Sequence, residues 1–554
     1  MTLNVVKGNE QGIDYGVLRA LVVDDYPGMR SALKMTLSNF GMTRIELAAS
    51  ASEVIFKVGN THYDVILCDF NLGEGRDGQQ LLEELRHRGL IHLDTVFIMV
   101  TAESVYEKVV ATAELAPDDY LIKPFSAEVL RNRLDGILLR KRAFSSVYRH
   151  YEANELEAAM TACDELIRDH PRYVVDALRF KGEVLNALGR FQEAEALYRQ
   201  VVGMRAIPWA RLGLAKALHA QKKEDEAEEL LHDVLEKTPE LVAAYDLLAD
   251  VRIARKDGAG AQEALSLGVA ISAKTVRRQQ KLGGVALENG DLAAARDAYA
   301  AVLEKGRHSV YVSPSDFGNL CRVQLEQGDV DAALDTLKKN RTILQASPQG
   351  QLVAAVMQGL AHTRAGRAEE AARALDEAIR LRGSGARVDE YAMLDMAGTC
   401  LSQGRNEEAD TIVSEVARNS HDSDSLLAKA RRLYEESGRG EDGARVLAAA
   451  TADVRKLNNE GVILAHKGDF QGAVERLLVA CREAPFNPRI LMNGIWVILK
   501  CLEQSGMDND LLDEARRLLA EVERQAPGHA RIAGLRHQMK EVENRFGIRP
   551  RSAR

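Results

Sequence analysis

The first 140 residues alternate short apolar runs with amphipathic stretches. The apolar runs are rich in Val, Ile and Leu, as buried strands are, and they cover 17–23, 44–49, 64–69, 95–101 and 119–124. Stretches with helical spacing separate them at 27–41, 51–60, 78–89 and 103–115, and a last one begins near Ser126. Five strands that alternate with five helices predict a parallel sheet covered on both faces, which is an α/β doubly wound fold.

Polar residues follow these apolar runs, where parallel sheets bind their ligands. Asp24 and Asp25 come directly after the first run, and Asp69 ends the third. Thr101 ends the fourth run, and Lys123 belongs to the end of the fifth. An aspartate at a strand end is, taken alone, more often a helix cap or a turn residue. All five positions at successive strand ends of one sheet predict a common site.

The residue types at this edge favour phosphoryl chemistry. Close carboxylates repel each other unless a cation lies between them, and the oxygens of Asp24, Asp25 and Asp69 are ligands that suit Mg²⁺. The metal ion would neutralise an incoming phosphoryl group, and Lys123 would supply a second positive contact. Asp69 is then the candidate nucleophile that becomes an acyl phosphate, and Thr101 can donate a hydrogen bond to the phosphoryl oxygens.

With these motifs, residues 17–138 resemble the receiver domain of bacterial two-component response regulators. The segment LVVDDYPGMRSAL is especially similar to chemotaxis-type, or CheY-like, receivers. The resemblance implies a flavodoxin-like fold and phosphorylation of Asp69 by a sensor histidine kinase. It also implies an Mg²⁺ site made by Asp24, Asp25, Asp69 and the backbone carbonyl of Asn71.

The resemblance implies further roles around the phosphoacceptor. Thr101 matches the switch hydroxyl, Tyr120 the switch aromatic residue, and Lys123 the lysine that precedes a cis-type proline. Asn71 and Glu103 lie two residues after Asp69 and Thr101, at the positions that tune the lifetime of the phosphate in the family.

The loop after Asp69 departs from the family pattern. It reads FNLGEGRDG, is one residue longer than the usual form, and has Gly73 where most receivers have proline. We expect a more flexible loop that alters the kinetics of phosphorylation and leaves the site itself in place.

The chain from about 140 to 545 carries no strand signals and repeats instead. In four stretches a glycine is followed twelve positions later by alanine, and four positions after that by tyrosine or leucine. The four sets are Gly182, Ala194 and Tyr198; Gly283, Ala295 and Tyr299; Gly359, Ala371 and Leu375; and Gly461, Ala473 and Leu477. Small residues at two of these positions let paired helices approach closely, and the larger residue fills the gap.

This pattern resembles the tetratricopeptide repeat (TPR), a helix–turn–helix unit of about 34 residues. Less regular copies begin near 140, 208, 242, 314 and 390, and degenerate ones near 425 and 488. We count about ten or eleven units and predict an all-α TPR superhelical solenoid, extended, with a long concave face. A generic helical bundle is the alternative, but it would not hold the register this long.

The division we predict is an N-terminal tail at 1–15, a receiver at 16–139, TPR repeats at 140–545 and a basic tail at 546–554. No Gly/Ser/Pro-rich linker separates the receiver from the repeats, and 126–160 is helical in character. The last receiver helix is therefore expected to run into the first repeat helix. We interpret the basic cluster at 140–142 as a solvated helix face.

Composition narrows the classes of function. The chain has 554 residues with 73 Lys and Arg against 82 Asp and Glu, so its net charge of −9 argues against a general polyanion-binding role. Proline is scarce at 12 residues, as expected of a mostly helical protein. The six cysteines form no C-x-x-C pair, so reduced thiols are expected. Without a signal-peptide pattern or an apolar run of membrane-spanning length, we predict a cytoplasmic protein with no membrane insertion.

We therefore predict a response regulator that accepts a phosphoryl group on Asp69 and switches protein–protein interaction through its TPR array. Its expected partners are a sensor histidine kinase and an unidentified effector protein on the concave face, with homodimerisation through the receiver left open. We expect no enzymatic activity beyond the receiver's own phosphorylation and dephosphorylation.

Three alternatives stand beside this prediction. A DNA-binding transcription factor is disfavoured, because nothing after residue 140 resembles a helix-turn-helix domain, and we expect no DNA partner. An aspartyl-phosphate phosphatase would need a second aspartate two residues after the nucleophile, where this chain has Asn71. A constitutive TPR scaffold, whose receiver is a phosphate sink or a docking module, remains open.

Overall fold

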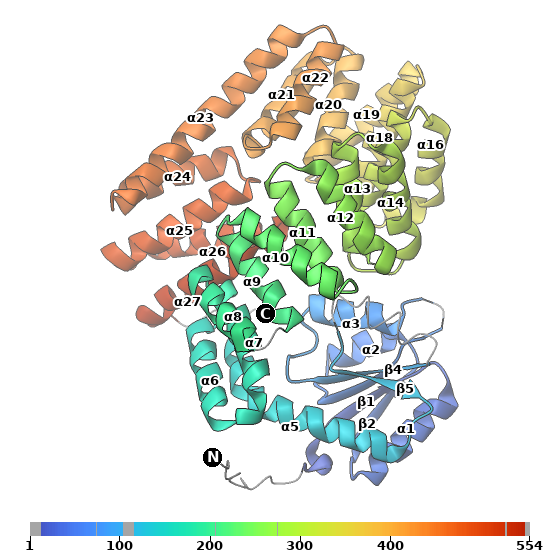
Figure 1. Cartoon of the computed structure of the whole chain (residues 1–554). Coiled ribbons are helices and arrows are strands. Elements are labelled where there is room, and N and C mark those ends of the chain that lie inside the picture. The colour runs from blue at the N-terminus through green and yellow to red at the C-terminus, as the bar shows by residue number, and fades with distance from the viewer. Residues whose placement is uncertain are drawn as a thin grey trace.

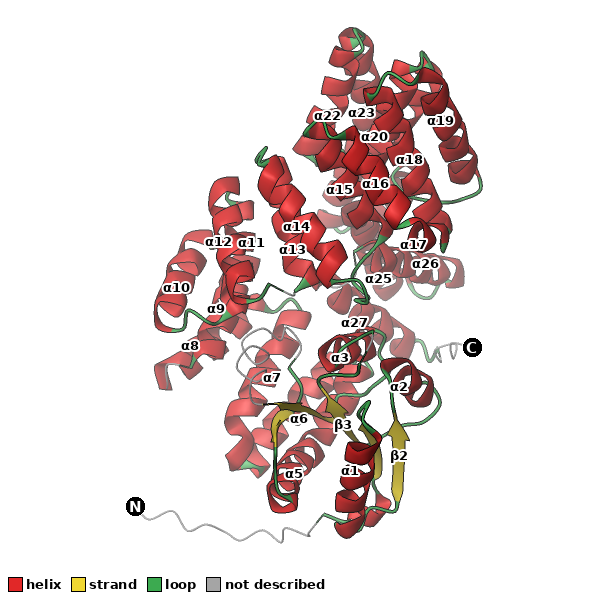
Figure 2. Ribbon diagram, turned by 90° about the vertical axis from the view of Figure 1, so that its right-hand side faces the viewer, coloured by secondary structure: helices red, strands yellow, loops and turns green. Residues whose placement is uncertain are grey.

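A computed structural model describes residues 13–73, 75–102, 116–204, 207–273, 275–526 and 529–548. Figure 1 shows an α/β part at the lower right and a helical solenoid that arches above and beside it. In the view turned by 90°, the sheet of the α/β part again lies below the helices of the solenoid (Figure 2).

The α/β part is built on a five-stranded parallel sheet with the order β2-β1-β3-β4-β5. Its strands are β1 Arg19–Val23, β2 Arg44–Ala48, β3 Val65–Asp69, β4 Val96–Ala102 and β5 Asp119–Lys123. This order is that of the doubly wound flavodoxin-like fold, and it confirms the predicted fold class. The first strand begins at Arg19 and not at residue 17, because Tyr15–Val17 form a short 3₁₀ turn.

Helices cover both faces of the sheet. Helices α1 (Pro27–Asn39) and α5 (Ala127–Glu152) pack on one face, where Leu37 and Leu134 join a core with Val22. Helices α2 (Ala51–Val58) and α3 (Gly78–His87) cover the other face. Alternate residues of each central strand thus enter different cores, which explains why these strands are apolar throughout. The helix predicted at 103–115 lies outside the described residues.

One helix, α5, joins the sheet to the solenoid without a break, as expected from the helical character of the junction. The interpretation of 140–142 as a solvated face is wrong for Lys141, which is buried. Its ammonium group lies 2.8 Å from Asp118 Oδ1 and donates to the carbonyl of Leu93 at 2.5 Å. The reason is that α5 continues along the edge of the α/β part, which covers this face of the helix.

The solenoid consists of helices that pack in consecutive pairs, and the pairs pack on one another. Its first half contains α6 Leu156–Asp169, α7 Val174–Ala187, α8 Phe191–Met204, α9 Pro208–Ala220, α10 Glu224–Lys237, α11 Val242–Ala254, α12 Gly258–Ile271, α13 Val276–Glu288, α14 Leu292–Lys305, α15 Pro314–Glu326 and α16 Val330–Lys339. A short helix, α17 (Arg341–Gln345), follows α16.

The second half departs from strict pairing at one long helix. It contains α18 Pro348–Arg364, α19 Ala368–Gly383, α20 Glu390–Ser402, α21 Asn406–Asn419, α22 Asp424–Glu436, α23 Gly440–His466, α24 Phe470–Glu483, α25 Pro488–Ser505, α26 Asn509–Gln525 and α27 Ala530–Arg545. The 27 residues of α23 pack against both α22 and α24, so one helix serves two neighbouring pairs. This sharing accounts for the degenerate repeat signal near residue 425.

The repeat spacing has a direct steric explanation. A Cβ atom built on Gly182 would lie 2.4 Å from the Tyr198 hydroxyl oxygen, and one on Gly461 would lie 2.6 Å from Leu477 Cγ. The glycine therefore receives the large residue of the next helix, as the spacing predicted. Gly359 differs, because its nearest side-chain neighbour is Thr399 at 3.4 Å from a built Cβ.

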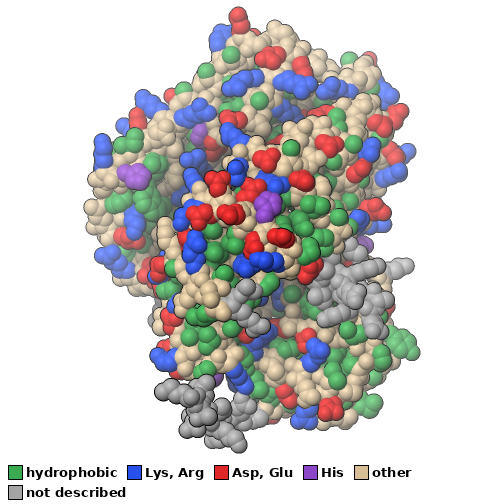
Figure 3. All heavy atoms as spheres, in the orientation of Figure 1, with side chains coloured by type: hydrophobic (Ala, Val, Ile, Leu, Met, Phe, Trp, Pro, Cys, Tyr) green, Lys and Arg blue, Asp and Glu red, His purple; other side chains and the backbone are tan. Residues whose placement is uncertain are grey.

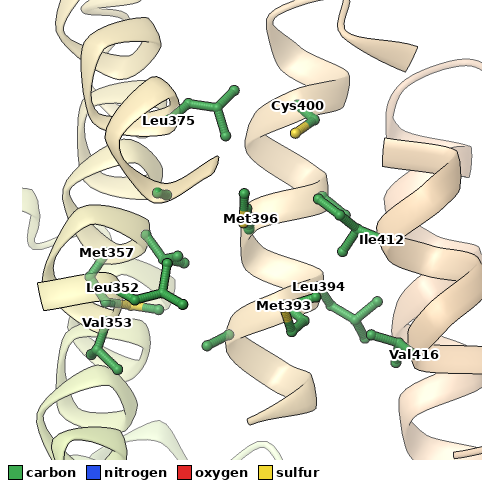
Figure 4. Packing of buried hydrophobic residues seen from close by; sticks show 14 of the residues in the cluster. Leu352, Val353, Met357, Leu375, Met393, Leu394, Met396, Cys400, Ile412 and Val416 are labelled. Atoms are coloured by element: carbon green, nitrogen blue, oxygen red, sulfur yellow. The ribbon is translucent and has the colours of Figure 1, made fainter. Parts of the chain in front are cut away.

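Apolar contacts hold neighbouring repeats together. Figure 4 shows Leu352 and Met357 of α18 facing Met396 of α20, with Ile412 of α21 on the other side of that helix. These side chains belong to one buried cluster that spans the middle of the solenoid. Contacts between neighbours are the expected source of stability in a repeat array.

The array turns back on itself, which differs from the extended form that we predicted. The last helix, α27, packs against α7 near the start of the solenoid, and Figure 1 shows the two helices side by side. The Lys540 ammonium group lies 2.9 Å from Glu155 Oε1 and donates to the carbonyl of Ala153 at 2.6 Å. Repeat spacing fixes how adjacent pairs pack, and only the accumulated rotation of many pairs brings the two ends together.

Across the described part of the chain, no helix is both long enough and apolar enough to cross a membrane.

Candidate functional site

The carboxyl ends of the parallel strands bring the predicted polar residues to one edge of the sheet. Asp24 follows β1, Asp69 is the last residue of β3, and Lys123 is the last residue of β5. The register places Asp69 beside Val100, one residue before Thr101, and Lys123 beside Ala102. Parallel pairing of the strands therefore brings the polar residues to one edge of the sheet, as the sequence predicted.

Three carboxylates form the acidic part of the site. Ligand oxygens of Asp24, Asp25 and Asp69 all lie within 4.8 Å of one another. Asp24 is buried, Asp69 is partly buried and Asp25 is exposed, so the group opens to solvent on one side. Asp24 Oδ1 accepts a hydrogen bond of 2.8 Å from the backbone N–H of Tyr26, which fixes this carboxylate at the start of α1.

Lys123 links two of these carboxylates. Its ammonium nitrogen lies 3.0 Å from Asp69 Oδ2 and 3.1 Å from Asp24 Oδ2. Burial raises the pKa of Asp69 above its ordinary value, with a further contribution from the charge of Asp24, although Lys123 opposes both. Burial acts to lower the pKa of Lys123, but its bonds to Asp69 and Asp24 outweigh burial, and its pKa is raised.

The donor set fits a divalent cation with hard oxygen ligands. Three carboxylates at this spacing carry more negative charge than one ammonium group offsets, and close like charges are stable only with a compensating cation. Carboxylate oxygens with an open, hydrated side are what Mg²⁺ prefers. Asp24, Asp25 and Asp69 are therefore the residues that would hold the ion.

The two predicted switch residues lie in the strands next to Asp69. Thr101 is 1% exposed, and its hydroxyl donates to the carbonyl of Ala102 at 3.3 Å. Tyr120 is partly buried, and its ring packs against the core under α2 and α3. Since Tyr120 pairs with Met99 across β4 and β5, it lies two residues back along the sheet from Thr101.

The structure says less about the two positions that were predicted to tune the phosphate lifetime. Asn71 is exposed in the loop, two residues after Asp69. Glu103 lies outside the described residues. The peptide bond between Lys123 and Pro124 is cis.

The loop after Asp69, described at 70–73 and 75–77, is anchored at both ends, which sequence reasoning missed. The backbone N–H of Gly78 donates to the carbonyl of Phe70 at 2.7 Å. A Cβ atom on Gly78 would lie 2.4 Å from the carbonyl oxygen of Asp69, so only glycine fits there. Gly73 has a φ of 74°, a conformation that proline cannot adopt, which explains the departure from the family pattern.

Arg76 and Glu84 are a second feature that sequence reasoning missed. Glu84 is buried in α3, and its carboxylate pairs with Arg76 at 2.9 Å and with Arg88 at 3.0 Å. The only signal was an acidic residue on the apolar face of a predicted helix, which is a weak one. This pair fixes the end of the loop against α3.

The solenoid contains a cavity of about 1290 Å³. Residues of the α19–α20, α21–α22 and α24–α25 connections line it, and Arg387 stacks on Phe486 there with 3.7 Å between guanidinium carbon and ring centre. Acidic and basic side chains both contribute to its wall, so it offers mixed polar and aromatic contacts.

Comparison with known protein families matches both the α/β part and the helical solenoid. The family model described as "Response regulator receiver domain" matches residues 20–135. Models described as "Tetratricopeptide repeat" match 146–208, 185–251, 318–339 and 356–420.

The chain is also similar over part of its length to individual proteins. Chemotaxis protein CheY of Pseudomonas aeruginosa is 30% identical over 124 residues, which cover 22% of this chain and 98% of the relative. The structure of chemotaxis response regulator CheY4 of Vibrio cholerae is 28% identical, covers 22% of this chain and 98% of that one, and has a TM-score of 0.20. A tetratricopeptide repeat protein from Parabacteroides merdae is 14% identical, covers 47% of this chain and 98% of its own, and has a TM-score of 0.29.

The acidic site at the sheet edge, the parallel sheet that carries it and the match to CheY over nearly all of that relative lead to one assignment. The chain belongs to the response regulator receiver family, and in it a CheY-like receiver is joined to tetratricopeptide repeats.

Proposed function

We propose that this protein is a response regulator of a two-component phosphorelay, with Asp69 as its phosphoacceptor and the TPR array as its output. The observation that carries the proposal is the double ion pair of Lys123 with Asp69 and Asp24 within the acidic group. A candidate nucleophile (Asp69), a cation for the phosphoryl oxygens (Lys123) and oxygen ligands for a metal ion therefore lie together.

The proposed reaction is phosphoryl transfer from a histidine of a sensor kinase. An oxygen of Asp69 attacks the phosphorus atom, the P–O bond forms as the P–N bond breaks, and the imidazole nitrogen keeps the electron pair. Lys123, already 3.0 Å from Asp69, turns to the phosphoryl oxygens and offsets their charge. Asp24, Asp25, Asp69 and the Asn71 carbonyl would hold Mg²⁺, which would supply further charge neutralisation.

Thr101 and Tyr120 are the proposed switch. The new phosphoryl group carries about −1.5 to −2 charges at neutral pH and accepts hydrogen bonds strongly. The Thr101 hydroxyl then gives up its long bond to Ala102 and donates to a phosphoryl oxygen. Tyr120 moves into the space that Thr101 leaves. Asp118, two residues before Tyr120, passes the change to α5 through its ion pair with Lys141.

We assign residues 16–139 to the receiver and 140–545 to the TPR output, with tails at 1–15 and 546–554. The proposed partners are a sensor histidine kinase for the receiver and an effector protein for the concave side of the repeats. A cavity with mixed polar and aromatic walls, such as the one around Arg387 and Phe486, supports a polypeptide partner. Figure 3 shows acidic and basic side chains interspersed on the visible face, a pattern that does not favour a nucleic-acid partner.

The proposed location is the cytoplasm, where reducing conditions keep thiols unpaired. Homodimerisation through the receiver stays part of the proposal, with sedimentation of the phosphorylated chain as its test.

The test compares wild type with Asp69→Asn after incubation with acetyl phosphate and Mg²⁺. Intact-mass analysis records the phosphoryl adduct, and capture from lysate on both proteins records the bound partners. We expect an adduct on wild type alone and a captured set that differs between phosphorylated and untreated protein. An adduct with an unchanged captured set favours the constitutive scaffold with a phosphate-sink receiver. Absence of an adduct with either the small donor or a kinase contradicts the proposal.

A further inference from the structure

The receiver touches the solenoid at a point far from α5. Arg76, in the loop after Asp69, donates from Nε to the carbonyl of His308 at 3.1 Å. The ring of His87, at the end of α3, packs edge-on against the ring of Tyr311 with 5.3 Å between centres. Figures 1 and 2 both show α3 on the side of the receiver that faces the solenoid. Two contacts thus join this side of the receiver to the connection between α14 and α15, residues 306–313.

The α14–α15 connection is itself held in a defined conformation. The side-chain amide of Gln280 in α13 donates to the carbonyl of Tyr311 at 2.9 Å, and the guanidinium carbon of Arg277 lies 4.1 Å from the centre of the Tyr311 ring. Within the connection, the backbone N–H of Ser309 donates to the carbonyl of Gly306 at 2.7 Å. A change in this connection is therefore transmitted to α13, which belongs to the preceding repeat.

On the receiver side of this contact, the loop that carries Arg76 begins at Asp69, the proposed phosphoacceptor. The loop begins at Asp69 and ends at Gly78, where a backbone hydrogen bond and a close approach to the Asp69 carbonyl fix it. Between these ends the loop approaches the acidic group at Gly73, where a built Cβ atom would lie 3.2 Å from Asp25 Oδ2. A phosphoryl group on Asp69 needs room and charge contacts at this place. Because the loop is fixed at Asp69 and at Gly78, we expect the displacement to fall between these residues and to reach Arg76. The Nε atom of Arg76 lies 2.9 Å from Glu84 Oε2 as well as 3.1 Å from the His308 carbonyl.

We propose that the loop after Asp69 is a direct signal outlet to the TPR array: phosphorylation of Asp69 withdraws Arg76 from His308 and frees the α14–α15 connection. This inference rests on the proposed phosphoacceptor role of Asp69. It adds a route separate from the one through Thr101, Tyr120 and α5. The contact holds a particular repeat, formed by α13 and α14, against the receiver until the phosphoryl group arrives.

The experiment measures backbone hydrogen exchange over residues 306–313 in the full chain, before and after acetyl phosphate and Mg²⁺. Intact mass of the same samples records the adduct. The variants are Arg76→Ala, which removes the contact, and Asp69→Asn, which removes the phosphoacceptor. Arg88→Ala is the matched control, because Arg88, just after α3, also pairs with Glu84 but has no described contact with the solenoid.

In wild type we expect an adduct and an increase of about tenfold in exchange at Ser309, Tyr311 and Val312, as for loss of one hydrogen bond to a charged group. Arg76→Ala should show the faster exchange before any donor is added, still form the adduct, and gain little on phosphorylation. Arg88→Ala should behave as wild type does.

Two results would overturn the inference separately from the proposed function. The first is a full adduct with unchanged exchange at 306–313, and the second is Arg76→Ala exchanging as slowly as wild type. In both cases Asp69 keeps its role and the signal leaves by another route. Absence of any adduct, in contrast, removes the proposed function and this inference together.

Discussion

Lys222 and Lys256 adopt the left-handed backbone conformation at turns within helix pairs, with φ of 62° and 63°. At most of the equivalent described turns a glycine takes this place, as Gly189 does with a φ of 72°. A residue with a Cβ atom is strained in this region by roughly 1 kcal/mol, and glycine is not. Each of these lysines therefore adds backbone strain to a turn at which glycine would be unstrained.

Replacing Lys222 with glycine should stabilise the protein. We expect Lys222→Gly to raise the free energy of unfolding by about 0.5–1 kcal/mol, because the strain disappears and the side chain is exposed. Lys222→Ala is the control, since it removes the side chain and keeps the Cβ atom. Urea denaturation of both variants decides the point: an equal gain from alanine and glycine would mean that backbone strain is not the cause.

A buried ionic cluster joins three repeats through Asp395. Its carboxylate lies 2.6 Å from Arg322 Nε and 2.7 Å from Lys429 Nζ, and both Arg322 and Asp395 are under 5% exposed. Burial alone would raise the pKa of Asp395, but the charges of Arg322 and Lys429 outweigh it, and the pKa is lowered. Asp389 and Tyr391 also face Arg322, at 3.9 Å and 5.6 Å.

The sign of the pH dependence follows from that lowered pKa. The stability that Asp395 contributes is present above its ordinary pKa of 3.8 and is lost as the pH falls through its lower folded value. We expect Asp395→Asn to cost about 3–5 kcal/mol at neutral pH, since it leaves the buried Arg322 and the partly exposed Lys429 without this carboxylate. Urea midpoints from neutral to acid pH should fall less steeply for this variant than for wild type. Parallel curves would contradict the assignment.

For single residues, the sequence predicts a place in a site only where neighbouring positions in the chain indicate it. Asp24 directly follows an apolar run, and Asp69 and Lys123 stand at the ends of two others; parallel pairing brings strand ends together whatever the loops contain. Arg322 and Asp395 are 73 positions apart, and their pairing depends on how repeats stack. No pattern in the sequence near Arg322 or Asp395 indicates this pairing.

Helix α5 is the element that joins the receiver to the repeats in one continuous helix. It runs for 26 residues and continues through Gly136 without interruption. The cost of a glycine inside a helix is about 1 kcal/mol, and burial of Leu134 and Ile137 on either side exceeds it. A lone glycine is thus a weak stop signal when the flanking apolar positions keep their spacing.

Replacing Gly136 with alanine should stiffen this junction. A Cβ atom at this position meets nothing within 4 Å, so Gly136→Ala should raise the free energy of unfolding by about 0.5–1 kcal/mol. Hydrogen exchange along α5 should slow, most of all at residues on either side of 136. Faster exchange there would show that the junction bends at this glycine in solution.

In the described part of the molecule, the receiver is joined to the solenoid by α5 and by contacts with the α14–α15 connection, and the last helix of the solenoid packs against its first helices. The closure rests on α27 packing against α7 and on the bonds of Lys540 to Glu155 and Ala153. Repeat spacing predicted the units and their order, because the spacing reflects contacts within and between adjacent pairs. The closure itself arises from small rotations summed over all pairs, which no local pattern records.

Reversing the charge at Lys540 should loosen the closure. Lys540→Glu places two carboxylates together, and we expect a larger radius of gyration by small-angle X-ray scattering at low salt, where exposed charges are least screened. Lys540→Arg should keep the wild-type value. Lys500→Glu is the matched control, because Lys500 pairs with Glu503 inside α25. An unchanged radius for Lys540→Glu would show that apolar packing alone closes the array.

The most direct test of the central claim is to identify the phosphorylated residue. The full chain is treated with acetyl phosphate and Mg²⁺, reduced with borohydride, which converts an aspartyl phosphate to homoserine, and mapped by peptide mass spectrometry. Asp69 as phosphoacceptor predicts homoserine at position 69 in wild type and at no position in Asp69→Asn. Homoserine at another aspartate, or at none in wild type, would contradict the claim.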